Sequence, residues 1–342
     1  MPRTVKRSMH RQSLRKSIAL PVILVVVHLL AALSTSSEAA PAPAWKPARP
    51  VTLIVPSPAG GGLDINSRIL AMYAEKHLGQ RIQVMNKVGG NNQLGFSEAA
   101  RSRPDGETVV IMHTSVVTDQ FLVKDSLYRA DVVRPLVQIA YDPNVLVVPV
   151  GSPLDMPLKD LMAYGKQHEG ELKVGVGGMW TGHDFTRVTT EMAGGFTMRR
   201  VGFGGGGPNV TALLGGHVDL SITFLSESYQ QVKSGQLKAI AVAGPERSGS
   251  LPDVPTFAEM GYPEVSWGIW RMLAVPKATP DEIVYAWQDA VKKTLDDPAT
   301  KAAYEKAGIQ MVYRSADDCL KFMKSEEARY KAVIDKLGLK PQ

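Results

Sequence analysis

The sequence predicts an α/β protein, and three observations lead to that class. Short apolar runs typical of strands alternate with longer stretches of helical periodicity along most of the chain. Most of these runs are followed by a cluster of Gly, Ser, Thr or Pro, which indicates a turn into the next element. The roughly 300 residues after the N-terminal segment are long enough for two domains. This alternation favours mostly parallel sheets flanked by helices.

The individual elements follow from the same patterns. The expected strands are Val51–Val55, Ile82–Met85, Thr108–Met112, Val145–Pro149, Lys173–Val176, Arg199–Phe203, Leu220–Phe224, Ala239–Ala243 and Met272–Val275. The expected helices are Asp64–His77, Gln93–Ala100, Leu158–Gln167, His183–Met192, Pro208–Leu214, Ser226–Ser234, Asp281–Asp296, Pro298–Ala307 and Ala316–Leu337.

Two interruptions in this pattern predict crossings between two lobes. The first lies near Ala140–Asn144, and the second lies near Val265–Trp270, after a proline-rich turn. One lobe is therefore expected to hold residues 45–143 plus 268–342, and the other residues 144–267. We expect a ligand cleft between the lobes, because α/β proteins bind small molecules outside the carboxyl ends of their strands.

Residues 1–39 predict a secretory signal peptide. Six basic residues precede an apolar run from Ile18 to Leu33, and small residues follow it. The run has about 16 residues, fewer than the roughly 20 that a membrane span needs, so cleavage after Ala39 is favoured over a retained anchor. The mature protein is expected to be exported and soluble.

Charge and cysteine content narrow the function classes. The whole chain carries a net charge of +6, but residues 1–39 hold six of the 39 basic and one of the 33 acidic residues. The mature chain keeps 33 basic and 32 acidic residues, a net charge of +1, and so gives no reason to expect nucleic-acid binding. Cys319 is the only cysteine, so no intramolecular disulfide can form.

The most informative motif is the loop Gly60-Gly61-Gly62 after the first strand, followed by Asp64 and a helix. Glycines let backbone N–H groups approach a ligand, and the first turn of the helix adds unpaired donors and the positive end of its dipole. The motif predicts a site for a carboxylate or a phosphate. The alternative is that the glycines only turn the chain and Asp64 only caps the helix.

Further loops at strand ends offer neutral hydrogen-bond donors. The loop with Gly89, Gly90, Asn91 and Asn92 joins another strand to a helix, and the hydroxyls of Thr114 and Ser115 follow the third strand. In the second lobe, the candidates are Trp180, Thr181, His183, Gly205, Gly206 and Thr223. Trp180 could line the apolar part of a pocket, although a tryptophan there can equally pack in the core.

Other chemistries have little support in the sequence. Residues Gly202–Gly207 formally match G-x-G-x-x-G, but they lie deep in the chain and Pro208 more simply marks the start of a helix. The seven histidines have no metal-ligand spacing, so neither a metal nor another cofactor is expected. An enzyme that uses His183 or His113 with a nearby hydroxyl remains an alternative.

Four motifs in order resemble the substrate-binding proteins of tripartite tricarboxylate transporters, also called Bug receptors. They are V-P…G-G-G-x-D…R at Val55–Arg68, P-D-G at Pro104–Gly106, L-L-G-G-x-V-D at Leu213–Asp219 and L-P-D-V-P-T at Leu251–Thr256. The resemblance implies a type II-like periplasmic binding protein of two lobes, without enzymatic activity. It further implies that the protein closes on a small organic acid and delivers it to a membrane permease. A monomer is the default expectation.

The resemblance also bears on the site. It implies that the two glycine-rich loops of the first lobe hold one carboxylate, that Thr114 and Ser115 add hydroxyl contacts, and that Thr181 and His183 face the ligand from the second lobe. The family's second loop usually reads R-P-G-A-G-G-N, whereas here two asparagines replace glycines. Thr223 stands where an aspartate often binds a ligand amine, which makes an amino-acid ligand less favoured. A periplasmic sensor or partner-binding module is the remaining alternative.

Overall fold

The computed structural model describes residues 45–90, 92–128 and 130–341. The predicted signal peptide, residues 1–39, lies outside the described residues. The strands are β1 (Val51–Val55), β2 (Ile82–Asn86), β3 (Thr108–His113), β4 (Val133–Pro149), β5 (Lys173–Val176), β6 (Arg199–Gly202), β7 (Leu220–Phe224), β8 (Leu237–Ala243), β9 (Gly268–Pro276) and β10 (Gln310–Arg314).

The helices mostly follow the strands in alternation, which confirms the α/β class. They are α2 (Gly62–Leu78), α3 (Gln93–Ala100), α4 (Ser115–Leu122), α5 (Leu158–Gln167), α6 (Gly182–Gly194), α7 (Gly206–Leu214), α8 (Leu225–Lys233), α9 (Asp281–Asp296), α10 (Pro298–Lys306) and α11 (Ala316–Lys336). A short 3₁₀ helix, Ala130–Val132, precedes β4.

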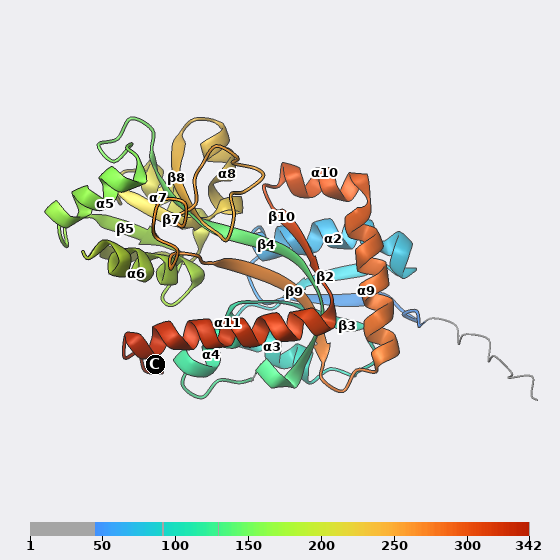
Figure 1. Cartoon of the computed structure of the whole chain (residues 1–342). Helices are drawn as coiled ribbons and strands as arrows, with labels where there is room; N and C mark the ends of the chain where they lie inside the picture. The colour runs from blue at the N-terminus through green and yellow to red at the C-terminus, as the bar shows by residue number, and fades with distance from the viewer. Residues whose placement is uncertain (1–44, 91, 129, 342) are drawn as a thin grey trace, which may run out of the picture. The chain divides into compact units, whose positions relative to one another are not determined.

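The sheet is organised around β4 and β9. Its order is β2-β1-β3-β9-β4-β7-β5-β6, with β8 and β10 also paired to β4. The outer pairs β1–β2, β1–β3, β5–β6 and β5–β7 are parallel, whereas β4 and β9 run antiparallel to their neighbours. Figure 1 shows β4 and β9 running between the group of helices α5–α8 and the group that includes α2, α9 and α10.

The long strand β4 corrects one sequence expectation. We expected a break near Ala140–Asn144, but the strand continues through it. Its first part, up to Pro143, pairs with β9, and the part from Asn144 pairs with β7 and β8. Proline at position 135 is tolerated because the register of the β4–β9 pair shifts between Pro135 and Val137. The change of partners places residue 142 at a junction in the sheet.

Four clusters of buried apolar side chains stabilise these layers. Two of them draw all their buried members from residues 145–265, around β5, β7 and β8. The other two pack β1, β3 and β9 against α2 and α9 on one face and against α4 and α11 on the other. The lobe boundaries 45–143 plus 268–342 and 144–267 remain a prediction. Among the described helices, none is long and apolar enough to cross a bilayer.

Candidate functional site

The first glycine-rich loop ends at the N-terminus of α2. Gly60 has φ of +80°, which favours glycine, and Gly61 is the N-cap residue, with no hydrogen bond from a side chain to cap the helix. The carboxylate of Asp64 accepts from Gly60 N at 2.9 Å and Arg68 Nε at 2.9 Å, and from Asn86 Nδ2 at 3.0 Å. Asp64 therefore shapes the loop, and the N–H groups of the first helical turn remain available to a ligand.

The loop before α6 repeats this arrangement with a tryptophan in place of the glycine. Trp180 has φ of +55°, and its N–H donates to Asp184 Oδ2 at 3.1 Å. Asp184 also accepts from Arg187 Nε at 2.7 Å, and the N-cap Thr181 makes no side-chain cap. A left-handed conformation costs a residue other than glycine about 1–2 kcal/mol. Such strain persists where the surroundings enforce it, often at functional sites.

A small cavity lies where several helix N-termini converge, and we call it the Trp180 cavity. Its volume is about 90 Å³, and it is lined by Asn92, His113, Thr114, Ser115, Thr118, Asp119, Met179, Trp180, Thr181, Gly182, Phe224, Ile269 and Tyr330. The N-cap residues of α3, α4, α6 and α8 are all among them, and those of α3, α4 and α6 make no side-chain cap. This convergence of helix N-termini favours an anion.

Backbone conformation singles out the same cavity. Among the described residues, three that are not glycine have positive φ, and two of them, Asn92 at +76° and Trp180 at +55°, line the Trp180 cavity. Asn92 stands where the family usually has glycine, and asparagine tolerates this conformation better than most residues. Its place in the cavity wall agrees with a role in ligand contact.

Two titratable side chains form the wall next to β3. Burial and the nearby Arg271 lower the pKa of His113 to about 3, so its imidazole is neutral at physiological pH. The Oγ of Ser115 lies 3.4 Å from Nε2 of this histidine. Burial raises the pKa of Asp119 to about 6, although Tyr128 and Gln93 donate hydrogen bonds to its carboxylate.

A buried ion pair, absent from the sequence-based candidates, lies beside this wall. Arg271 on β9 donates from Nη2 to Asp142 Oδ2 on β4 at 2.8 Å, and both side chains are only 1% exposed. Asp142 also accepts from the backbone N–H of Ser226 at 3.1 Å and from its hydroxyl. A Cβ built on Gly62 would lie 2.8 Å from Arg271 Nη2, so the guanidinium packs directly against the first residue of α2.

In the glycine-rich loop before α7, Gly204–Gly207, a side chain of the protein itself occupies the space next to the helix N-terminus. A Cβ built on Gly206, the first residue of α7, would lie 1.9 Å from Cδ of Glu227. The same carboxylate accepts from Phe224 N at 3.0 Å and lies 3.2 Å from Nε2 of His183. Gly177 N donates to Nδ1 of His183 at 3.0 Å, so both ring nitrogens have partners. The side chain of Glu227 thus takes the anion position at α7.

The structure places the residues predicted from the sequence in three groups. The first lines the Trp180 cavity: Asn92, Thr114, Ser115, Trp180 and Thr181. The second lies in the loops before α2 and α3 or, for Gly62, at the first residue of α2: Gly60, Gly61, Gly62, Gly89 and Gly90. The residues of the third group contact other groups of the protein or lie at the start of α7: Asp64, His183, Gly205, Gly206 and Thr223. The hydroxyl of Thr223 lies 2.8 Å from that of Ser228. Asn91 lies outside the described residues, and all these ligand assignments remain predictions.

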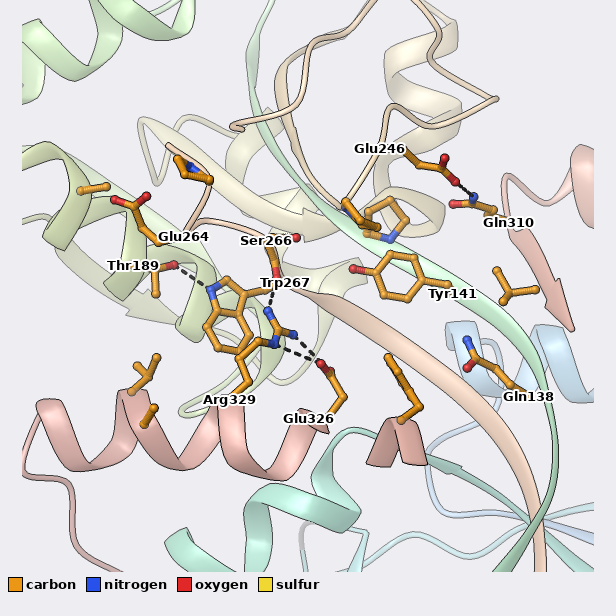
Figure 2. A pocket seen from close by; sticks show the side chains of 18 of the residues that line it. Gln138, Tyr141, Thr189, Glu246, Glu264, Ser266, Trp267, Gln310, Glu326 and Arg329 are labelled. Atoms are coloured by element: carbon orange, nitrogen blue, oxygen red, sulfur yellow. Dashed lines mark hydrogen bonds and ion pairs between the residues drawn. The ribbon is translucent and has the colours of Figure 1, made fainter. Parts of the chain in front are cut away.

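A second cavity, which we call the Trp267 cavity, has about 790 Å³ and holds none of the predicted residues. It lies between α6, α11, β10 and the segments 245–246 and 263–267. Figure 2 shows the guanidinium of Arg329 lying against Trp267, with Glu326 and Ser266 around it. The donors of Arg329 are thus directed to partners within the protein. Among the described residues, no group of three His, Cys, Asp or Glu side chains is placed to hold a metal.

Comparison with known proteins gives a consistent result. Residues 66–339 match the model of the tripartite tricarboxylate transporter family receptor. Protein BugT of Bordetella pertussis strain Tohama I is 30% identical over 314 residues, which cover 90% of this chain and 95% of that protein.

Solved structures with bound acids have the same fold. The structure of Rpa4515 from R. palustris with adipate is 28% identical, has a TM-score of 0.79, and the match covers 86% of this chain and 99% of that one. The structure of MatC from Rhodopseudomonas palustris with bound malate is 27% identical with a TM-score of 0.73, and covers 84% and 99%.

Proposed function

Because the chain belongs to the tripartite tricarboxylate transporter receptor family, we propose that it is a periplasmic receptor for a small organic carboxylate, which it delivers to a tripartite tricarboxylate-type permease. We include in this proposal the removal of residues 1–39 on export, a monomeric mature protein, and contact with the permease subunits. The adipate and malate found in similar structures indicate the size of the expected ligand.

The observation that carries the proposal is the ring of helix N-termini around the Trp180 cavity. The N-cap residues Asn92, Thr114 and Thr181 begin three helices without a side-chain cap. Each such end leaves backbone N–H donors and a partial positive charge, which a carboxylate satisfies without a counter-ion from solvent. The aromatic ring of Trp180 adds an apolar wall for the carbon skeleton of the ligand.

The two histidines proposed for an enzyme do not support catalysis. His113 lies near the hydroxyl of Ser115, but a base with a pKa of about 3 is too weak to take a proton from a hydroxyl at neutral pH. His183 is 2% exposed, and its ring nitrogens contact Gly177 and Glu227. Both therefore serve structure or ligand contact better than proton transfer, and we propose that the protein is not an enzyme.

The direct test is to identify the ligand on the purified protein. Residues 40–342 are expressed, and small molecules released on denaturation are identified by mass spectrometry; a panel of organic acids is then screened by thermal shift and calorimetry. We expect one organic acid per chain. If no acid is released and none raises the melting temperature, the receptor proposal is wrong.

A pair of variants ties binding to the cavity. The double variant Ser115→Ala, Thr181→Ala removes two hydroxyls from the Trp180 cavity and should weaken binding of the identified acid by at least about ten-fold, since even one hydrogen bond to a charged group contributes about 1.5–3 kcal/mol. Ser325→Ala removes an exposed hydroxyl on α11 and should leave the affinity unchanged. Equal affinities in both variants would place the ligand elsewhere.

A further inference from the structure

Arg271 is a buried cation with unused hydrogen-bonding capacity. Its side chain is 1% exposed, and in the described part of the chain its Nε and Nη1 have no hydrogen-bond partner. Only Nη2 is bound, to Asp142. Buried donors are rarely left unpaired, because each unmade hydrogen bond costs folding free energy. A carboxylate is suited to accept from these free N–H groups, because a hydrogen bond between two charged groups is stronger than one between neutral groups.

The carboxylate of Asp142 is shared between Arg271 and the first turn of α8. Asp142 Oδ1 accepts from the backbone N–H of Ser226, in the first turn of α8, and Oδ2 accepts from the Ser226 hydroxyl as well as from Arg271. The carboxylate is thus the anion that stabilises the positive end of α8. His113, the residue opposite Arg271 on β3, is neutral, so it does not add a second positive charge beside the guanidinium.

The position of Arg271 links the two anion-binding features of the site. Its Nη2 packs against Gly62, where α2 begins without a side-chain cap. Two of its neighbours line the Trp180 cavity: His113, opposite on β3, and Ile269, two residues earlier on the same face of β9. The guanidinium therefore lies between the N-terminus of α2 and the wall of the Trp180 cavity.

We propose that Arg271 is a specificity-determining residue that binds a second acidic group of the ligand. One carboxylate of the ligand contacts the helix N-termini around the Trp180 cavity, and the other contacts the N-terminus of α2 and the free N–H groups of Arg271. The ligand is then an acid with two carboxylates, and an acid of the same length with one carboxylate binds more weakly. Arg271 can play this part only if the protein binds an organic acid, so the assignment rests on the proposed function.

The test compares pairs of acids that differ by one carboxylate. Succinate and butyrate, glutarate and pentanoate, adipate and hexanoate, and phthalate and benzoate are titrated into residues 40–342 by calorimetry. For the pair that binds most tightly, we expect the diacid to bind at least ten-fold more tightly than the monoacid. The double variant Arg271→Met, Asp142→Asn removes both charges of the ion pair, so that no unpaired aspartate is left buried.

In this double variant the diacid should lose about ten-fold to a hundred-fold in affinity, while the affinity for the monoacid stays within three-fold. The matched control is Arg329→Met, Glu326→Gln, which makes the same kind of exchange in the Trp267 cavity and should change neither affinity. If the double variant at Arg271 does not fold, Arg271→Lys keeps the positive charge but lacks the planar guanidinium. It should lower the affinity for the diacid by at least five-fold and leave the affinity for the monoacid unchanged.

The outcomes separate the two proposals. If the wild-type protein binds acids and the preference for the diacid survives in the folded Arg271 variant, Arg271 does not read the second carboxylate, and the proposed function stands. If the wild-type protein binds the monoacids more tightly than the diacids, Arg271 does not bind a second carboxylate, and the proposed function again stands. If the wild-type protein binds no acid of any chemistry, the proposed function fails, and the role of Arg271 fails with it.

Discussion

Two glycine-rich loops with the same position in the sequence pattern, each between a strand and a helix, have different surroundings in the structure. At Gly60–Gly62 the carboxylate of Asp64 accepts from Gly60 N, the helix α2 begins without a side-chain cap, and the guanidinium of Arg271 packs against Gly62. At Gly204–Gly207 the carboxylate of Glu227 packs against Gly206 at the start of α7. A glycine-rich loop before a helix predicts an anion, but the anion can be the protein's own side chain.

The largest effect is expected at Gly62. A side chain at this position would have its Cβ 2.8 Å from Arg271 Nη2 and 3.5 Å from Ser226 Oγ, so Gly62→Val displaces the guanidinium from the site. We expect more than a hundred-fold loss of affinity for the bound acid in calorimetry. Gly61→Val is the control: Gly61 has φ of −77° and a Cβ there would lie 3.5 Å from the nearest atom, Pro58 O.

From the sequence alone we expect a β-branched residue at Gly61 to abolish binding, and this pair of variants tests that prediction. The structure leaves room for a side chain at Gly61, and the constraint lies one residue later. Equal loss of affinity in both variants would show that the loop backbone, and not the contact with Arg271, governs binding.

The buried acid Asp119, next to Gln93 at the start of α3, should make stability depend on pH. The pKa of Asp119 is about 6 in the folded protein against an ordinary value of 3.8, so the folded state favours the protonated form. Its contribution is fully present below about pH 4 and is lost as the pH rises through 6, by up to about 3 kcal/mol. Urea unfolding of Asp119→Asn and wild type should therefore diverge between pH 4 and 6, with the variant more stable at pH 7.5. Parallel curves would contradict the burial of this charge.

At the second loop, Gly206→Ala should affect stability and not binding. Its Cβ would lie 1.9 Å from Glu227 Cδ, so Glu227 must move and lose its contact with Phe224 N. We expect the free energy of unfolding to fall by about 1–3 kcal/mol, with ligand affinity unchanged within three-fold. Gly207→Ala, with no atom within 4 Å of its Cβ, should not destabilise the protein. Loss of affinity in Gly206→Ala would give the second loop a ligand role after all.

The smallest effect concerns Trp180, which holds the place that Gly60 has in the first loop. Because its φ is +55°, Trp180→Gly should be more stable than Trp180→Ala by about 1 kcal/mol, the reverse of the order at ordinary positions. Both variants should bind the acid more weakly, since both remove the aromatic wall. Thermal and chemical unfolding of the two variants test the first statement, and a higher stability of the alanine variant would contradict it.

The regular elements were predictable where local patterns decide them. Strands Val51–Val55, Lys173–Val176 and Leu220–Phe224 and helices Gln93–Ala100, Leu158–Gln167 and Asp281–Asp296 are confirmed with the expected bounds. Each has a clear apolar period and a turn signal at its end. Local sequence was sufficient there because it agrees with the tertiary packing.

Elements that depend on distant partners were missed. Helix α4, Ser115–Leu122, begins two residues after a strand, makes no side-chain cap and carries two valines, which have low helix propensity. The first part of β4 contains Asp142, within the expected interruption at Ala140–Asn144, and its pairing with β9 and Arg271 keeps the strand continuous. Strand β10 is short, and among the described strands it pairs with β4 alone.

The loops of the candidate site were predictable from the sequence, but the buried ion pair of Arg271 and Asp142 beside it was not. The expectation was a site formed by neutral donors and helix ends, and the buried Arg271, next to this site, was not among its candidates. The signal was present: an arginine interrupts the apolar strand Gly268–Pro276, and Asp142 interrupts the apolar strand β4. Pairing two such charges requires the strand register, which no local pattern provides. The occupation of the second loop by Glu227 likewise depends on a contact between α7 and α8.

The most direct test of this account is a crystal structure of residues 40–342 with the acid identified on the purified protein. We expect its carboxylates in the Trp180 cavity and against Gly62 and Arg271, and the carboxylate of Glu227 still in place at Gly206. An acid bound at Gly204–Gly207 with Glu227 displaced, or in the Trp267 cavity, would contradict the account.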